Sequence, residues 1–350
     1  MGAFAHVRSM WKTRGLYVGL LAAVILLSAA RATAQSQGQA ASPIWEYAIP
    51  TAGSSPRGIT QGPDGAIWFT EQVGNRIGRV ASDGTMTEYP LPTAQSVPHG
   101  LTLGPDDALW FTENGGNAIG RITAAGTIRE YPIPTADSGP VGITLGPDGA
   151  LWFAEERGNK IGRIDAQGAI TEYPLPASGS RPRSVAAGAD GALWFTEEAA
   201  SKIGRITLAG VITEYPLPSP NSGPEGIVAG PDGALWFAEE YGHRIGRITL
   251  DGTIREFAIP SSWPSPEDLA VGPNSTLWFT EESGNAIGRI DPDGTISEFP
   301  VPTPNSKPQG ICVGSDGSMW FTEAAGNNIA RFITAPLKYQ IALPYIEQQR

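Results

Sequence analysis

The sequence repeats itself every 42 residues, and no other feature restricts its fold as strongly. Seven copies follow one another without an insertion. Each copy carries one proline, at Pro56, Pro98, Pro140, Pro182, Pro224, Pro266 and Pro308. Each also carries a Trp-Phe pair and a glutamate, at Glu71, Glu113, Glu155, Glu197, Glu239, Glu281 and Glu323. Repeats of this length indicate a solenoid, a propeller or an array, whose units bury their faces against one another.

Within one copy the pattern is that of short strands. RGITQ leads through the turn GPDG to AIWFTE, then through a short loop to RIGRV, then through SDG to TMTEYPLP. Asp-Gly turns between runs of β-branched and aromatic residues predict hairpins, and no helical period is present. We therefore predict an all-β fold over residues 44–344: a seven-bladed β-propeller of four-stranded antiparallel blades. Because every copy has them, we expect the Trp and Phe of WFTE to pack between blades.

Two segments compete to complete the seventh blade. The outermost strand of each unit ends in a run like TEYPLP, which also occurs before the first unit as IWEYAIP (44–50) and, degenerate, after the last as LKYQIALP (337–344). Seven blades need only seven outer strands. The N-terminal segment is closer to the consensus, so we expect it to close the ring and the C-terminal copy to be surplus. Residues 345–350 are then a C-terminal tail.

The N-terminus predicts export. Arg8, Lys12 and Arg14 precede the apolar run LYVGLLAAVILLSAA, and Ala32 and Ala34 stand at the A-x-A positions. This is the pattern of a signal peptide over residues 1–34, followed by a disordered polar leader over residues 35–43. The run is short for a membrane span, although an uncleaved anchor is the alternative. The mature chain would be periplasmic or secreted.

Charge and cysteine content exclude several classes of partner. Four of the 24 basic residues and none of the 35 acidic ones lie in the first 34 residues, which leaves 20 against 35 and a net charge of −15. Such a chain is repelled by nucleic acid and by anionic lipid, so we expect neither as a partner. The single cysteine allows no internal disulfide. We expect a monomer.

Candidate site residues are those where the copies disagree. The residue after each repeat proline opens the innermost strand, and the residue after each repeat glutamate closes the next strand, so both sets should surround one mouth of the central channel. The first set is Arg57, His99, Val141, Arg183, Glu225, Glu267 and Gln309; the second is Gln72, Asn114, Glu156, Glu198, Glu240, Glu282 and Ala324. The expected ligand is a small molecule or a glycan. The facing carboxylates Glu225, Glu240, Glu267 and Glu282 could also hold magnesium or calcium.

Other positions carry narrower expectations. The invariant glutamates are expected to be structural, paired with backbone or with the repeated IGR arginines. Tyr241, His243 and Trp263 depart from the consensus in one sector and suit stacking on a sugar, an aromatic group or a cation, ordinary loop variation being the alternative. His99 is a candidate general base or a spectator, because base catalysis needs a positioned proton and a partner.

The run GPDGALWFTE…GNxIGRI…GxITEYPLPTP resembles the virginiamycin B lyase (streptogramin lyase) family over essentially all of residues 44–344. The resemblance implies an exported antibiotic-resistance lyase that opens a cyclic depsipeptide at its ester by elimination. It also implies a magnesium ion that polarises the ester and a histidine that acts as general base.

The family's catalytic set is not matched residue by residue. The resemblance places the base at Gln309, which cannot accept a proton near neutral pH, and a metal-ligand glutamate at Lys307. It places a substrate-contacting histidine at Glu267, a second metal carboxylate at Ala324 or Glu323, and a tyrosine at Arg57. A ring shifted by blades, with His99 as the base, fails as well, because Val97 would then be the metal ligand.

Three functions remain open from the sequence. The first is a lyase-family propeller with lost or altered chemistry and a ligand-binding mouth lined by Arg57, Arg183, Glu225, Glu267 and Lys307. The second is a lyase or a gluconolactonase-like lactone hydrolase with a relocated metal site. The third is a scaffold that binds protein or polysaccharide. The propeller fold hosts all three.

Overall fold

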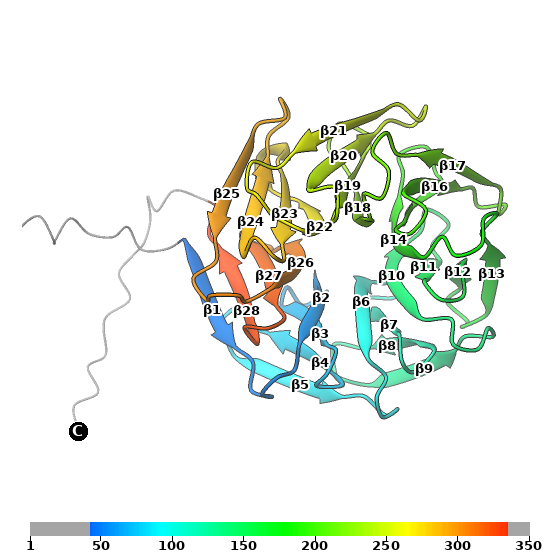
Figure 1. The fold of residues 1–350 in the computed structure, drawn as a ribbon. Helices are drawn as coiled ribbons and strands as arrows, with labels where there is room; N and C mark the ends of the chain where they lie inside the picture. Colours follow the sequence, from blue (N-terminus) through cyan, green and yellow to red (C-terminus); the bar gives the residue numbers. More distant parts are fainter. Residues whose placement is uncertain (1–42, 335–350) are drawn as a thin grey trace, which may run out of the picture. The chain divides into compact units, whose positions relative to one another are not determined.

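The structure, a computed structural model, describes residues 43–334. These residues form 28 strands in seven four-stranded antiparallel sheets, arranged around a central channel (Figure 1). One short 3₁₀ turn, η1 (Pro273–Ser275), is the only helical element in this range. The prediction of an all-β, seven-bladed propeller is confirmed.

Each blade runs from the channel outward in chain order, except the seventh. Blade 1 contains β2 (Pro56–Gln61), β3 (Ile67–Glu71), β4 (Arg76–Val80) and β5 (Met86–Pro90). Blade 2 contains β6 (Pro98–Leu103), β7 (Leu109–Glu113), β8 (Ala118–Ile122) and β9 (Ile128–Pro132). Blade 3 contains β10 (Pro140–Leu145), β11 (Leu151–Glu155), β12 (Lys160–Ile164) and β13 (Ile170–Pro174). Blade 4 contains β14 (Pro182–Ala187), β15 (Leu193–Glu197), β16 (Lys202–Ile206) and β17 (Ile212–Pro216).

The remaining blades keep the same dimensions. Blade 5 contains β18 (Pro224–Ala229), β19 (Leu235–Glu239), β20 (Arg244–Ile248) and β21 (Ile254–Ala258). Blade 6 contains β22 (Pro266–Val271), β23 (Leu277–Glu281), β24 (Ala286–Ile290) and β25 (Ile296–Pro300). Blade 7 contains β26 (Pro308–Val313), β27 (Met319–Glu323), β28 (Asn328–Phe332) and, as its outer strand, β1 (Ile44–Ala48).

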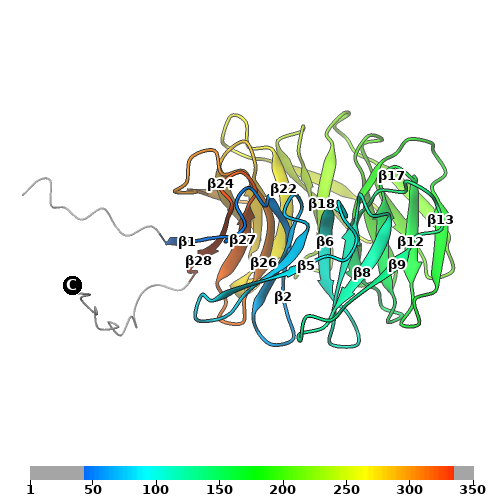
Figure 2. The same ribbon diagram turned by 90° about the horizontal axis from the view of Figure 1, so that it is seen from below.

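The N-terminal strand closes the ring, as predicted. β1 pairs antiparallel with β28, with Tyr47 opposite Ile329, and lies beside it in both views (Figures 1 and 2). Tyr47 stacks on Trp320 at 5.5 Å, as Tyr89 stacks on Trp68 within blade 1. The loop that follows β1 is tied to blade 7, because the Ser54 amide donates to Asn327 Oδ1 at 2.7 Å. Both ends of the ring are therefore held by one segment. The second copy of this strand, residues 337–344, lies outside the described residues.

The Trp and Phe that recur in every copy fill the space between blades, which confirms the prediction for the WFTE motif. One cluster joins Trp68 and Ile77 of blade 1 to Leu109, Phe111 and Ile122 of blade 2. The same combination recurs at the following junctions. Each blade thus covers the face of its neighbour, which is why one unit cannot be stable alone.

In blades 1 to 5 a turn aspartate bonds both the tryptophan and the IGR arginine of its unit. Asp64 accepts hydrogen bonds from Trp68 Nε1 (3.1 Å) and Arg79 Nε (2.7 Å). The arginine lies over the Trp ring, 5.8 Å from its centroid. The expectation that the IGR arginines pair with the invariant glutamates is therefore wrong. The arginine instead bonds the aspartate of the GPDG turn, which lies at the opposite end of the strand from the invariant glutamate.

Threonines link the innermost strands of neighbouring blades by hydrogen bonds. Thr70 Oγ1 accepts from the Gly58 amide at 2.9 Å and donates to the His99 carbonyl of the next blade at 2.8 Å. Ala154 and Ala238 replace this threonine in blades 3 and 5. The carbonyls of Arg183 and Glu267, which such threonines would hold, consequently lack this bond.

The expected signal peptide, leader and C-terminal tail lie outside the described residues, apart from Pro43. Within residues 43–334 no helix is long and apolar enough to cross a membrane.

Candidate functional site: the charged mouth of the channel

The innermost strands surround a cavity of about 660 Å³. At one end it is lined by six of the seven residues that follow the repeat prolines: Arg57, His99, Arg183, Glu225, Glu267 and Gln309. The seventh, Val141, is only 1% exposed and packs with Trp152 and Val185 in the core between blades. This packing explains why blade 3 alone carries an aliphatic residue at that position.

The two variable sets meet at this mouth. Arg183 follows a proline, and it bonds Glu156, which follows an invariant glutamate, at 3.1 Å. Arg183 also lies 3.9 Å from Glu198, which follows the invariant glutamate of its own blade. This is the arrangement expected when a hairpin brings the start of one strand beside the end of the next.

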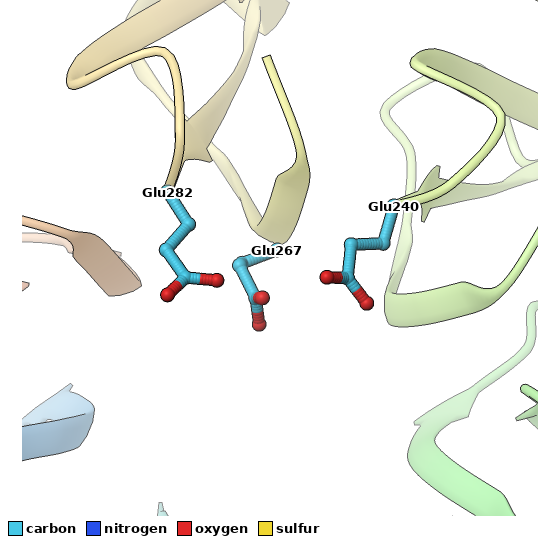
Figure 3. Close-up of side chains that lie close together, drawn as sticks. All are labelled: Glu240, Glu267 and Glu282. Atoms are coloured by element: carbon cyan, nitrogen blue, oxygen red, sulfur yellow. The ribbon is translucent and has the colours of Figure 1, made fainter. Parts of the chain in front are cut away.

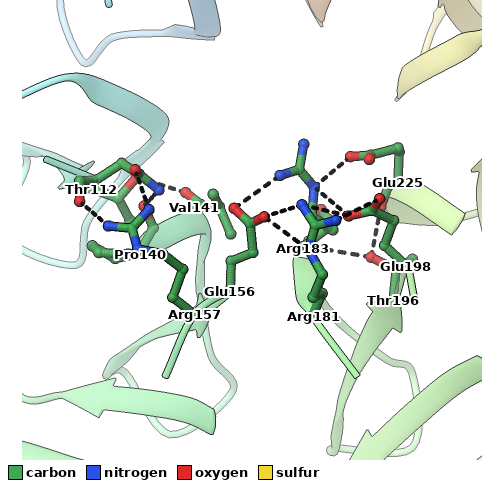
Figure 4. A network of polar contacts seen from close by, with 12 residues as sticks. Thr112, Pro140, Val141, Glu156, Arg157, Arg181, Arg183, Thr196, Glu198 and Glu225 are labelled. Atoms are coloured by element: carbon green, nitrogen blue, oxygen red, sulfur yellow. Dashed lines mark hydrogen bonds and ion pairs between the residues drawn. The ribbon is translucent and has the colours of Figure 1, made fainter. Parts of the chain in front are cut away.

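Arg183 is the centre of an ion-pair network on one side of the mouth (Figure 4). Its guanidinium bonds Glu225 Oε2 at 2.8 Å and Glu156 Oε2 at 3.1 Å, with 14% of its side chain exposed. Arg181 adds contacts to Glu156 and to Glu198. The positive charges of this side are therefore matched by carboxylates of the chain itself.

Three carboxyl groups converge on the other side. Oxygen atoms of Glu240, Glu267 and Glu282 lie within 4.8 Å of one another and point into the same space (Figure 3). Burial and the negative charge of Glu225 raise the pKa of Glu240 to about 7. Burial and Glu225 also raise the pKa of Glu267 well above its usual range. Carboxyl groups held this closely need a proton or a cation between them.

Two of the three carboxyl groups already have a basic partner. Lys307 Nζ bonds Glu282 Oε1 at 2.9 Å, and Arg57 lies 3.7 Å from Glu267. Burial would raise the pKa of Glu282, but the hydrogen bond from Lys307 holds it below its usual value. In the described part of the chain no basic side chain forms an ion pair with Glu240.

The aromatic residues lie beside this acidic group. Trp263 is 73% exposed and meets the ring of His243 edge-on, with centroids 5.2 Å apart. Tyr241, 57% exposed, directly follows Glu240, and its hydroxyl donates to Glu198 at 3.2 Å. The Glu282 amide bonds the Ser265 carbonyl, two residues beyond Trp263. His243 and Trp263 thus meet at the junction of blades 5 and 6, whereas Tyr241 lies against Gly223 and reaches Glu198 of blade 4.

His99 lines the cavity without a carboxylate partner. Burial, together with the positive charges of Arg57 and Arg183, lowers the pKa of its imidazole well below the usual value. Its side chain forms no hydrogen bond within residues 43–334. A base needs an orienting group and a suitable pKa, and His99 has neither.

The positions at which the family resemblance places the metal do not fit one. Lys307 brings an ammonium group to the carboxylate of Glu282. Glu323 is fully buried in blade 7, where Asn328 donates to it at 3.2 Å, and it lies apart from Glu240 and Glu282. Gln309 is 6% exposed and lines the cavity. We derive no reaction step through a metal at these positions.

The invariant glutamates are buried inside the blades, away from the mouth. Glu71 is fully buried, and burial together with the neighbouring Glu88 of the outer strand raises its pKa to about 8. Glu113 and Glu239 reach about 7, and Glu155, Glu281 and Glu323 reach about 8, again through burial. Several outer-strand partners are themselves hydrogen-bonded, as Glu88 is to Thr51. The invariant glutamates are therefore part of the blade interiors and not of the mouth.

One cavity residue escaped the sequence analysis. Asp268 stands where five of the seven blades have glycine, and it lines the cavity. It accepts hydrogen bonds from the Leu269 amide (2.9 Å) and the Ile311 amide (3.2 Å). Burial raises its pKa to about 6. The only signal in the sequence was an acidic residue at a glycine position.

A model of the virginiamycin B lyase family matches residues 28–197 and again residues 177–345. This chain belongs to the virginiamycin B lyase family. The two matches overlap over residues 177–197.

Solved structures of family members superpose over most of the chain. Virginiamycin B lyase from Staphylococcus aureus is 45% identical, with a TM-score of 0.79 over 82% of this chain and 98% of that chain. A catalytically inactive variant of that enzyme, solved with quinupristin, is 44% identical, with the same TM-score over 82% of this chain and 98% of that chain. A gluconolactonase-type protein, at 18% identity and a TM-score of 0.54 over 83% of this chain and 92% of that chain, shares the fold alone.

A curated virginiamycin B lyase from Bacillus licheniformis matches locally. It is 54% identical over 39 residues, which are 11% of this chain and 13% of that protein. The matched part of the chain therefore spans about one eighth of that relative's length. Its 39 residues are fewer than the 42 of a single repeat.

Proposed function

We propose that this chain is an exported ligand-binding propeller of the lyase family, in which the elimination chemistry of the family is lost or altered. The ligand, a small molecule or a glycan, would enter the charged mouth of the channel. The observation that carries this proposal is the bond from Lys307 to Glu282 beside Gln309. A cation and an amide stand where a metal ligand and a base are expected, and an amide cannot remove a proton near neutral pH.

Incubation with a type B streptogramin tests the loss of chemistry. We expect no linearised product, which would have the mass of the intact antibiotic but a different retention time. The Staphylococcus aureus enzyme, assayed in parallel with magnesium, is the positive control. Robust turnover by this chain would contradict the argument from Lys307 and Gln309.

A metal-dependent lactone hydrolase is the second candidate, favoured by the convergence of Glu240, Glu267 and Glu282. Carboxylate oxygens are ligands that magnesium and calcium prefer, and such an ion would polarise an ester carbonyl. Native mass spectrometry of the purified protein, before and after chelation, separates the candidates. One divalent ion per chain would favour the hydrolase. A metal-free protein that also binds no small molecule would favour the protein- or polysaccharide-binding scaffold.

Export is tested by the N-terminus of the mature protein. We expect cleavage after Ala34, so that Gln35 becomes the first residue, and recovery of the protein from the periplasm or the medium. An intact N-terminus in the membrane fraction would instead indicate the uncleaved anchor.

A further inference from the structure

We propose that the mouth binds an organic monocation: an ammonium group held by Glu240, Glu267 and Glu282, on a body that packs against Trp263. This inference rests on the ligand-binding function proposed above and specifies its ligand class.

This sector of the mouth has one more carboxylate than it has basic groups paired with them. Four carboxylates face the mouth there, Glu225, Glu240, Glu267 and Glu282. Three basic groups form ion pairs with them: Arg183 with Glu225, Arg57 with Glu267, and Lys307 with Glu282. The remaining carboxylate is Glu240, which forms no ion pair within residues 43–334. A half-buried carboxylate without a basic partner favours a cation beside it.

A second feature of the cavity is independent of the carboxylates. Gln309 is 6% exposed and lines the cavity, next to Glu267 in the ring of innermost strands. No residue within 43–334 forms a hydrogen bond with its side-chain amide. Its oxygen is thus available to accept a hydrogen bond from a ligand N–H.

The surroundings favour an organic cation over a metal ion. Lys307 and Arg57 already bring two positive charges to Glu282 and Glu267 and would repel a divalent ion. Trp263 is largely exposed in the loop before β22, where the Ser265 carbonyl accepts from the Glu282 amide, and a bare metal ion would leave this ring unused. Exposed aromatic faces next to carboxylates suit an ammonium group with an apolar or ring-shaped body.

Paired probes of equal shape test the charge. Benzylamine is positively charged at pH 7.5 and benzyl alcohol is neutral, and calorimetry would measure both against the full chain. We expect saturable binding of benzylamine, at least tenfold tighter than benzyl alcohol.

Variants locate the site. Glu240→Gln should weaken benzylamine at least tenfold and leave benzyl alcohol unchanged, and Trp263→Ala should weaken both. Asp137→Asn is the matched control. It removes one carboxylate at the repeat position of Trp263 in another loop, where the side chain is 81% exposed, and should change neither affinity. Unfolding temperatures of all variants confirm that each one is folded.

Several results would overturn the inference. They are equal binding of the two probes, no saturation by benzylamine, benzylamine binding that survives Glu240→Gln, and displacement of benzylamine by stoichiometric Mg²⁺. If benzyl alcohol binds as tightly and remains sensitive to Trp263→Ala, the ligand class is wrong but the ligand-binding mouth stands. Turnover of a streptogramin would instead contradict the proposed function itself.

Discussion

At the scale of single residues, the mouth combines buried charge with strained backbone. Arg183 is the most enclosed of its basic residues, and Glu225 and Glu156 depend on it. The residue before each repeat proline adopts a left-handed conformation, which suits Gly139 and Gly223 but is imposed also on Val97, Arg181 and Lys307. This conformation turns two long basic side chains toward the rim, at a cost in backbone energy.

Removing Arg183 should strongly destabilise the fold. Arg183→Met leaves two carboxylates in a poorly solvated place, so we expect a loss of about 3–5 kcal/mol in the free energy of unfolding. Chemical denaturation measures it. Arg157→Met is the control, because its partner Asp137 is 81% exposed, and it should cost about 0–1 kcal/mol. Equal losses in the two variants would show that the Arg183 network is solvated.

Val97 offers the opposite effect. A β-branched residue at φ 51° is unfavourable, whereas asparagine tolerates this region. Val97→Asn should raise the free energy of unfolding by about 1 kcal/mol, seen as a higher midpoint in urea at unchanged slope. A lower midpoint would mean that the packing of Val97 outweighs its strain.

At the scale of elements, the outer strand of blade 7 decides whether the ring is closed. β1 supplies Tyr47 to Trp320, and its Glu46 accepts hydrogen bonds from the Thr303 amide and hydroxyl, both at 2.9 Å. The six other outer strands follow their blades directly in the chain, so only this strand joins residues from opposite ends of the sequence.

Deletion of residues 43–50 should abolish the cooperative thermal transition, because β28 and Trp320 would be uncovered. A synthetic peptide of this segment, added in excess, should restore the transition through the same pairing. Deletion of residues 335–350 serves as the comparison and should leave the transition in place. The reverse pattern would assign closure to the C-terminal copy.

The sequence was most informative where the copies agree. The 42-residue period, the Asp-Gly turns and the repeated Trp and Phe were sufficient for the blades, their strands and their packing. The partner of the IGR arginines was mispredicted, because the order of residues in a copy does not show which carboxylate lies at the same end of the strands as the arginine. Val141 looked like a rim residue because period alone does not show which way a side chain turns.

The functional sector was only partly accessible from the sequence. Its aromatic residues were identifiable as departures from the repeat. The convergence of Glu240 and Glu282 with Glu267 depends on the spacing of neighbouring blades, which no local pattern contains. Asp268 was missed because it occupies a position where most blades have no side chain. The bond between Lys307 and Glu282 likewise required the closed ring.

At the scale of the whole molecule, seven buried glutamates make stability depend on pH. Burial raises their pKa values in the folded protein, to about 7 or 8 for six of the seven, while an unfolded chain has glutamates near 4.5. The folded state therefore binds more protons. The stabilisation is complete below about pH 4.5 and is lost as the pH rises through 7 to 8.

Thermal unfolding at pH 5, 7 and 9 measures this dependence. We expect the highest unfolding temperature of the three at pH 5 and the lowest at pH 9. Glu113→Gln keeps the side-chain shape but cannot ionise, so it should reduce the loss at pH 9. A stability that rises steadily from pH 5 to pH 9 would show that these carboxyl groups are ionised in the native protein.

The threonine links between innermost strands have a consequence for how such a ring can diversify. Five such threonines hold the backbone carbonyl of the residue after a repeat proline rather than its side chain, and blades 3 and 5 lack the threonine. Positions of this set that are not fixed by core packing, as Val141 is, or by an ion-pair network, as Arg183 is, can therefore exchange one side chain for another while the backbone keeps its hydrogen bonds. A gene that duplicates or exchanges a single blade could move a charge around the opening step by step, and in this way change what the protein recognises without having to fold anew.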